Sequence, residues 1–279
     1  MAAPDFVAVG HVTLDHIGGA VRPGGAALYA AITAHRLGLS AGILTSHGAD
    51  FPLDAVPPQI EVVTVEAAET TAFEHRLDGE RRELTVSAAA RPLGVVDVPD
   101  DWRDAAIVLL APVLNEVDPL VATAFPDAAL GAAAQGWLRG PGAGLVMPTV
   151  WSPPDFLVGR LQALFLSRED VGIDVAGTVA MFQRVPVGAL TAGAEGALLF
   201  VNGERFEVRP HPVHEADGTG AGDVFAAAFL IDYQRHGNPW DAAATAACAG
   251  ALSVQGEGIA AIPDRKALDE ALRAYRAAE

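Results

Sequence analysis

The segment 217–223, with the sequence DGTGAGD, constrains this chain more than any other feature. Its three alternating glycines permit backbone turns that other residues avoid, and the apolar run VFAAAF that follows predicts a buried helix beginning there. A turn of this kind directs several N–H groups to one place, and the positive end of the helix dipole adds to them. The segment therefore predicts an anion site that can bind phosphate without a lysine.

Two aspartates bracket this turn. Asp223 falls in the first turn of the predicted helix, next to the anion site. A carboxylate in that place can take the proton from a hydroxyl that attacks a bound phosphate, which is general-base catalysis of phosphoryl transfer. The alternative is that Asp217 or Asp223 only caps a helix. Three glycines between two aspartates, at the head of an apolar helix, favour the catalytic interpretation.

The charge of the chain limits its partners. The formal net charge is -17 at pH 7, and Lys266 is the single lysine. Nucleic acids and anionic membranes are bound by surplus lysine and arginine, so we expect neither as a partner. P-loop NTPases, protein kinases and Schiff-base enzymes need a lysine at a defined place that this sequence does not offer. Backbone dipoles and a metal cation must therefore bind any anionic ligand.

Length and composition predict one domain over residues 1–279, because 279 residues that are 51% hydrophobic can bury a large core. The single cysteine, Cys248, excludes an internal disulfide and is interpreted as a small core residue. The H-x-x-H pair at 211–214 is interpreted as an exposed loop and not as a zinc site. The first residues lack the basic region of a secretory signal, and no apolar segment reaches spanning length, which favours the cytoplasm.

Apolar runs alternate with helical patterns along the chain, which predicts a mostly parallel sheet covered on both faces. The segment 141–154, rich in proline and glycine, is interpreted as a connecting loop. The predicted elements are strands at 6–10, 41–46, 60–66, 107–112, 163–167 and 186–191, hairpins at 70–87 and 196–209, and helices at 26–37, 221–235, 241–254 and 264–278.

The segment 217–223 resembles the C-terminal signature of the PfkB (ribokinase-like) carbohydrate kinase family, with Gly218 in place of the usual threonine. The resemblance extends over essentially the whole chain. It implies an α/β fold of the ribokinase-like class, a three-layer sandwich with a mostly parallel central sheet and a small β lid. It also implies the catalytic roles: Asp223 as the base, with Gly220, Ala221 and Gly222 forming the anion hole for the transferring phosphate.

The N-terminal part resembles the acceptor side of the same family. The segment GHVTLD at 10–15 is similar to the strand-end element whose aspartate, here Asp15, binds sugar hydroxyls. The segment PGGA at 23–26 is similar to the family's di-glycine element, with Gly24 and Gly25 close to the acceptor. Tyr29 stands where the family usually has an asparagine, and the resemblance places it among the substrate contacts.

Two further segments resemble elements that bind ATP and magnesium in the same family. The segment LTAGAEG at 190–196 looks like the family's strand and turn beneath the ATP phosphates, which implies Thr191, Gly193 and Gly196 as ATP contacts. Ser167 and Asp170 occupy the place of an N-x-x-E element that manages magnesium and its waters. The alternative for Ser167 is a helix cap. The loops around Asp217 and at 253–258 resemble the family's potassium site, and they imply K+ in addition to ATP and Mg2+.

Only eight residues separate Asp15 from Gly24, so we expect a reduced lid formed mainly by residues 70–90. Several segments, including QGWLR at 135–139, look like the branch that contains myo-inositol kinases. Arg82 and Arg139 are candidate contacts for a polar substrate, but the sequence favours the interpretation that both are ordinary surface charges.

These inferences predict an ATP-dependent kinase that phosphorylates a hydroxyl of a sugar or cyclic polyol, for which myo-inositol is one candidate. The expected partners are small molecules, and the chain is expected to be a monomer or homodimer. A nucleoside or vitamin-precursor kinase of the same fold is one alternative. A non-catalytic sensor of sugar or nucleotide is another, although a sensor has no need of the base Asp223.

Overall fold

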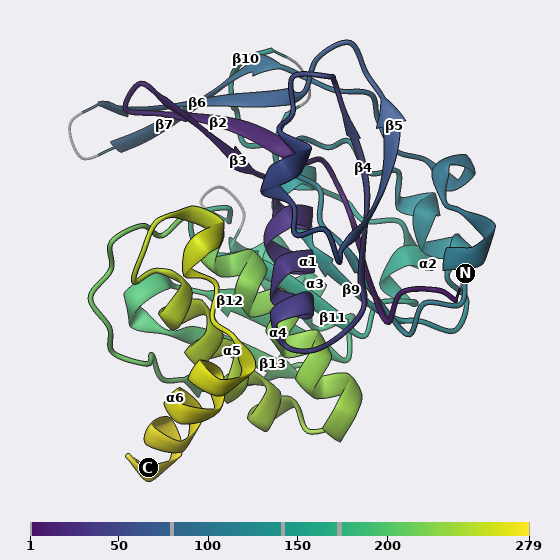
Figure 1. The fold of residues 1–279 in the computed structure, drawn as a ribbon. Helices are drawn as coiled ribbons and strands as arrows, with labels where there is room; N and C mark the ends of the chain where they lie inside the picture. Colours follow the sequence, from purple (N-terminus) through teal and green to yellow (C-terminus); the bar gives the residue numbers. More distant parts are fainter. Residues whose placement is uncertain (1, 79–80, 141–142, 172–174, 279) are drawn as a thin grey trace.

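A computed structural model describes residues 2–78, 81–140, 143–171 and 175–278. Its centre is a nine-stranded sheet in the order β14-β13-β12-β11-β9-β8-β1-β4-β5 (Figure 1). The run from β12 to β5 is parallel throughout, and β13 and β14 continue it as antiparallel strands. The strands are β1 (Phe6–Val9), β4 (Ala41–His47), β5 (Glu61–Glu66), β8 (Ile107–Leu110), β9 (Ala129–Ala133), β11 (Ala163–Ser167), β12 (Val187–Thr191), β13 (Ala197–Val201) and β14 (Glu204–Val208).

Both faces of the central strands are buried. In β1, Phe6 and Ala8 belong to one hydrophobic cluster, and Val7 and Val9 belong to a second cluster on the opposite face. Successive side chains of a strand point to opposite faces, so a strand that lies between two cores must be apolar throughout. This is why the predicted strands read as continuous apolar runs.

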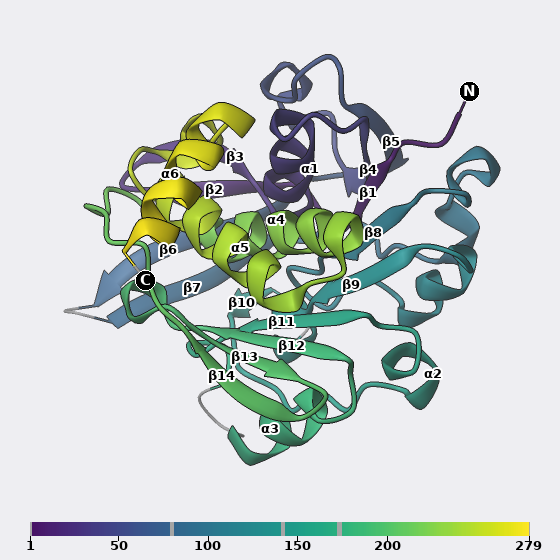
Figure 2. The ribbon, with the colours of Figure 1, turned by 90° about the horizontal axis from the view of Figure 1, so that it is seen from below.

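Helices cover the two faces of the sheet (Figures 1 and 2). The first cluster contains residues of α1, α4 and α5, while residues of α2 and α3 belong to the second, and α6 packs on α5. The arrangement confirms the predicted three-layer α/β class. The helices are α1 (Ala26–Arg36), α2 (Asp155–Val158), α3 (Val175–Phe182), α4 (Ala221–His236), α5 (Pro239–Ser253) and α6 (Arg265–Ala277).

A second sheet of five strands, in the order β10-β7-β6-β2-β3, lies beyond the end of the main sheet (Figure 1). It contains more than the predicted hairpin. Residues 13–24, for which no strand was predicted because the lid was expected to come mainly from residues 70–90, form β2 and β3 around Gly18 and Gly19. These glycines have φ of 59° and 85°, as a tight two-residue hairpin requires. The strands are β2 (Thr13–Ile17), β3 (Ala20–Gly24), β6 (Thr71–Asp78), β7 (Arg81–Ala88) and β10 (Gly144–Leu145).

Two further strands correct the sequence analysis. The short strand β10 lies inside the segment 141–154, which was predicted to be a connecting loop only, and pairs with β7. The strand β9 was missed because its sequence ALGAA has low strand propensity. It forms a strand because β8 and β11 pair with it on both sides. Gly131 makes room for α4, since an added Cβ would lie 2.4 Å from Leu230.

Candidate functional site

Four of the segments that the sequence analysis compared with the family's site come together where the parallel strands end. Gly10 follows β1, Gln135 follows β9, Ser167 ends β11, and Thr191 ends β12. Ser167 and Thr191 are direct register partners in the parallel pair β11–β12, so the two predicted nucleotide contacts lie side by side. In open α/β sheets, ligands bind outside the carboxyl ends of the strands.

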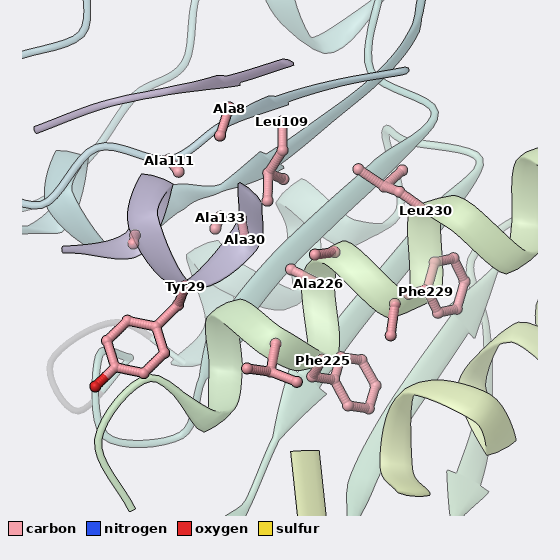
Figure 3. Packing of buried hydrophobic residues seen from close by; sticks show 14 of the residues in the cluster. Ala8, Tyr29, Ala30, Leu109, Ala111, Ala133, Phe225, Ala226, Phe229 and Leu230 are labelled. Atoms are coloured by element: carbon pink, nitrogen blue, oxygen red, sulfur yellow. The ribbon is translucent and has the colours of Figure 1, made fainter. Parts of the chain in front are cut away.

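The glycine-rich turn leads into α4, as predicted. Gly220 is the N-cap of α4 in the left-handed conformation, with φ of 78°, and Ala221 is the first helical residue. An added Cβ at Gly220 would lie 2.3 Å from ring atoms of Tyr29, whereas one at exposed Gly222 would meet nothing within 4 Å. Figure 3 shows the Tyr29 ring extending from α1 beside the start of α4. Gly220 is thus required by the fold, and Gly222 leaves the approach to the helix end open.

The carboxylate of Asp217 is held by backbone hydrogen bonds and an ion pair. Its carboxylate accepts hydrogen bonds from the amides of Thr219, at 3.0 Å, and Gly258, at 3.4 Å. Arg22 of β3 lies 3.3 Å from the same carboxylate and 3.0 Å from Glu257. Burial raises the pKa of Asp217, but these hydrogen bonds and Arg22 outweigh it and lower the pKa overall. Asp217 therefore links the turn to the second sheet and to the loop after α5.

Asp223 lies half-buried in the first turn of α4, where its amide donates to the carbonyl of Gly220 at 3.0 Å. Burial raises the pKa of its carboxyl to about 7. The charges of Asp170 and Asp15 raise it further, while Arg139 opposes them. A carboxyl with a pKa near neutrality can both accept and release a proton at physiological pH, which suits a general base.

This raised pKa predicts a pH-dependent contribution to stability. The folded protein binds the Asp223 proton more tightly than the unfolded chain does, because the pKa of about 7 exceeds the ordinary value of 3.8. The stability from this proton is fully present below pH 4 and is lost as the pH rises through 7. We expect the free energy of unfolding of wild type, relative to Asp223→Asn, to be larger at pH 5 than at pH 8 in urea titrations. An unchanged difference would contradict this.

Asp15 is buried at the inner end of the second sheet, on β2. Its Oδ1 accepts a hydrogen bond from Thr13 Oγ1 at 3.1 Å and lies 3.6 Å from Nε2 of His75 on β6. An added Cβ at Gly24 would lie 2.2 Å from Asp15 Oδ2, and one at Gly25 would lie 2.3 Å from a backbone carbonyl. The di-glycine element therefore makes room for Asp15 and for the backbone at residues 11–13, between β1 and β2.

Arg139 is not a surface charge, so the interpretation favoured from sequence is wrong for this residue. The half-buried guanidinium donates from Nη1 to the carbonyl of Val113 at 2.9 Å and lies 5.8 Å from the ring centroid of Phe73 on β6. Burial lowers its pKa, while the charges of Asp170 and Asp223 act in the opposite direction. The side chain of Arg82 lies outside the described residues.

Asp170 is held by hydrogen bonds on both carboxylate oxygens. Oδ2 accepts from the amide of Ser167, at 3.0 Å, and from its hydroxyl, at 2.7 Å; Oδ1 accepts from Gln135 at 2.9 Å. Among the described residues, no group of three histidine, cysteine or acidic side chains could hold a metal. Magnesium retains several waters and takes few protein ligands. Asp170 thus fits a position in the water shell of a magnesium ion that substrate phosphates bind directly.

The two glycines in the turn after β12, Gly193 and Gly196, have different surroundings. Gly196 has φ of 91°, and an added Cβ would lie 2.2 Å from the carbonyl of Val208, so packing against β14 requires glycine there. Gly193 has φ of 55° and nothing within 4 Å of an added Cβ. The hydroxyl of Thr191 donates a long hydrogen bond, 3.4 Å, to the carbonyl of Leu166. Of the three predicted ATP contacts, Gly193 therefore has the most open surroundings.

Two supporting residues were missed by the sequence analysis. Glu116 is buried and accepts hydrogen bonds from the amides of His11, Val113 and Leu114 at 2.6 to 3.0 Å, which joins the ends of β1 and β8. His75 was missed as a partner of Asp15. No sequence pattern marks either residue, because both act through contacts between distant segments.

Residues 164–265 match the family described as pfkB family carbohydrate kinase. The match begins in β11, includes the turn at 217–223 and Asp223, and ends at the start of α6. This stretch is therefore similar to the pfkB family. The pfkB match confirms the resemblance on the part of the chain that carries the predicted anion hole.

Two curated proteins that are similar to this chain are kinases. The cytidine kinase of Thermococcus kodakarensis is 26% identical over 265 residues, which cover 83% of this chain and 89% of the relative. The inositol 3-kinase of Oryza sativa subsp. japonica is 29% identical over 242 residues, which cover 80% of this chain and 59% of the relative. These matches indicate a phosphotransferase, a kinase of carbohydrates or nucleosides.

Solved structures confirm the ribokinase-like fold. A pyrophosphate-dependent myo-inositol-1 kinase converted into a myo-inositol-3 kinase superposes with a TM-score of 0.78 at 21% identity, covering 96% of this chain and 98% of that one. Ribokinase of Arabidopsis thaliana, in complex with ribose and ATP, superposes with a TM-score of 0.71 at 19% identity, covering 97% and 99%. Within the part of the chain that the structure describes, no helix is long and apolar enough to cross a membrane.

Proposed function

We propose that this chain is an ATP-dependent kinase, a single domain over residues 1–279, that transfers the γ-phosphate to a hydroxyl of a sugar or cyclic polyol. The observation that carries the proposal is the position of Asp223. It lies at the N-terminal end of α4, with its pKa raised to about 7 and within the electrostatic influence of Asp15, Asp170 and Arg139.

The proposed reaction uses Asp223 as general base. Asp223 takes the proton of the acceptor hydroxyl as its oxygen forms a bond to the γ-phosphorus. The bond between that phosphorus and the bridging oxygen breaks, and ADP leaves with the electron pair. The backbone of Gly220, Ala221 and Gly222, at the positive end of α4, stabilises the transferring charge. Magnesium, when bound, supplies further positive charge to the phosphates.

We assign the acceptor side to Asp15, Gly24, Gly25 and Tyr29. The carboxylate of Asp15 can accept hydrogen bonds from acceptor hydroxyls, and neighbouring His75 can donate one. An uncharged acceptor is favoured, because a second anion would be repelled by the carboxylates of Asp15 and Asp223. A sugar or polyol such as myo-inositol has this character.

We assign the donor side to Thr191, Gly193, Gly196 and Ser167, with Asp170 placing the waters of magnesium. K+ is included because the two loops compared with a potassium site are joined: the carbonyl of Val254 accepts hydrogen bonds from the amides of Ala216, at 2.7 Å, and Asp217, at 3.2 Å. Replacing potassium chloride with choline chloride would lower turnover if the ion takes part.

A nucleoside is the second candidate acceptor. The observation that favours it is the match to the cytidine kinase, which extends over 83% of this chain. A nucleoside is also uncharged, so the same carboxylate environment would accept its ribose hydroxyls.

The test is acceptor-dependent turnover. We expect the protein with magnesium and ATP to release ADP when a pentose, hexose, inositol or nucleoside from a panel is added, and the product to contain one more phosphate by mass spectrometry. Pyrophosphate in place of ATP tests the donor. ADP release that no acceptor increases, together with an unmodified acceptor, would contradict the proposal.

A further inference from the structure

Arg139 follows a segment, residues 135–137, whose residues are held by hydrogen bonds and close packing. Gln135 donates to Asp170 at 2.9 Å, and the amide of Gly136 donates to the carbonyl of Pro112 at 3.0 Å. An added Cβ at Gly136 would lie 2.3 Å from the Pro112 backbone, so the two chains are in close contact. Trp137 is buried and donates from its indole N–H to a carbonyl. The backbone that carries Arg139 is therefore built against the ends of β8 and β11.

The guanidinium itself is a half-buried cation without an ion pair. Among the described residues, no carboxylate lies within salt-bridge distance of Arg139. By contrast, Arg22 and Arg168 each pair with a carboxylate at 3.3 Å or less. Its hydrogen bond is to a carbonyl, which leaves most of its five N–H donors for other partners. Removing an arginine from water without an anionic partner is unfavourable, so this position suits an anion that is absent from the protein alone.

The groups around Arg139 indicate where that anion would lie. Asp170, Asp223, Glu116 and Asp15 all act on Arg139 electrostatically. Asp170 is on the proposed donor side, and Asp223 is the proposed base, so the guanidinium lies within the electrostatic influence of both. Lys266, the single lysine, is in α6.

We propose that Arg139 is a catalytic residue that binds the transferring phosphoryl group. This inference rests on the proposed kinase function. As the acceptor oxygen bonds to the γ-phosphorus and the bond to ADP breaks, the three oxygens of the phosphoryl group carry negative charge between the two. The planar guanidinium donates hydrogen bonds to these oxygens and adds to the contribution of the backbone amides of α4.

The first test compares Arg139→Ala and Arg139→Lys with wild type. We expect Arg139→Ala to lower kcat by about 10³-fold, with a change in the acceptor KM of less than about threefold, because the contact forms in the transition state. Arg139→Lys retains the charge without the planar fork and should lose less. Guanidinium ions at low millimolar concentration should restore part of the Arg139→Ala turnover. The matched control is Arg76→Ala, an exposed arginine of β6 that pairs with Glu74, which should retain wild-type turnover.

A second measurement does not depend on turnover. ADP with aluminium fluoride mimics a phosphoryl group in transfer, and calorimetry should show about 10²-fold weaker binding of this pair to Arg139→Ala, with unchanged binding of ADP alone. Equal binding to folded wild type and variant would overturn the inference, and so would an effect confined to the acceptor KM, which would place Arg139 on the acceptor instead. Wild type that binds the pair but phosphorylates no acceptor would count against the proposed function and leave the Arg139 result standing.

Discussion

Replacing Asp223 with asparagine is expected to abolish acceptor-dependent turnover, lowering kcat by about 10²–10⁴-fold, the usual contribution of a general base. Asparagine keeps the size and the hydrogen-bonding shape of the side chain but cannot accept the proton. The acceptor KM should change little, because binding does not require the base. Initial rates of ADP release at saturating acceptor measure the effect.

The control for this substitution is Asp232→Asn in the same helix. Asp232 is buried in α4 and pairs with His236 at 3.2 Å, more than two turns from the site. It should reduce stability without reducing kcat of the folded protein. Asp223→Asn with turnover above about a tenth of wild type would mean that another group accepts the proton.

Replacing Gly220 with alanine is expected to be the most destabilising single change in the glycine-rich turn. The backbone there has φ of 78°, which costs an alanine about 1–2 kcal/mol, and the new Cβ would lie 2.3 Å from the Tyr29 ring. Overpacking of this kind costs about 1–3 kcal/mol more. The free energy of unfolding from urea titration measures the sum, and displacement of the anion hole should lower activity in the protein that remains folded.

The other end of α4 provides the matched control. Gly237 caps the helix with φ of 68°, but an added Cβ would meet nothing within 4 Å. Gly237→Ala should therefore show the conformational cost alone. Adding Tyr29→Ala to Gly220→Ala should relieve the contact while leaving the strain. Equal destabilisation by Gly220→Ala and Gly237→Ala would refute the role assigned to the Tyr29 ring.

Local signals in the sequence accounted for much of the fold. The apolar runs gave the buried strands, and Asn202-Gly203, both with positive φ, gave the hairpin between β13 and β14. The strand β9 could not be predicted because alanine and glycine acquire strand structure there only from their neighbours. The hairpin of β2 and β3 did have a signal, the pair Gly18-Gly19, which was overlooked.

In the candidate site, too, some features follow from local sequence and others only from tertiary contacts. Its glycines and Asp223 lie together in one segment, so the sequence by itself determined the glycine-rich turn and the place of the carboxylate at the helix start. The surroundings of Arg139 depend on Val113, Phe73 and Asp170, which belong to three other segments. Only the tertiary structure decided that Arg139 is half-buried without an ion pair and that the pKa of Asp223 is raised. The reason is physical: turns and helix starts depend on adjacent residues, whereas burial and electrostatic coupling depend on groups that folding brings together.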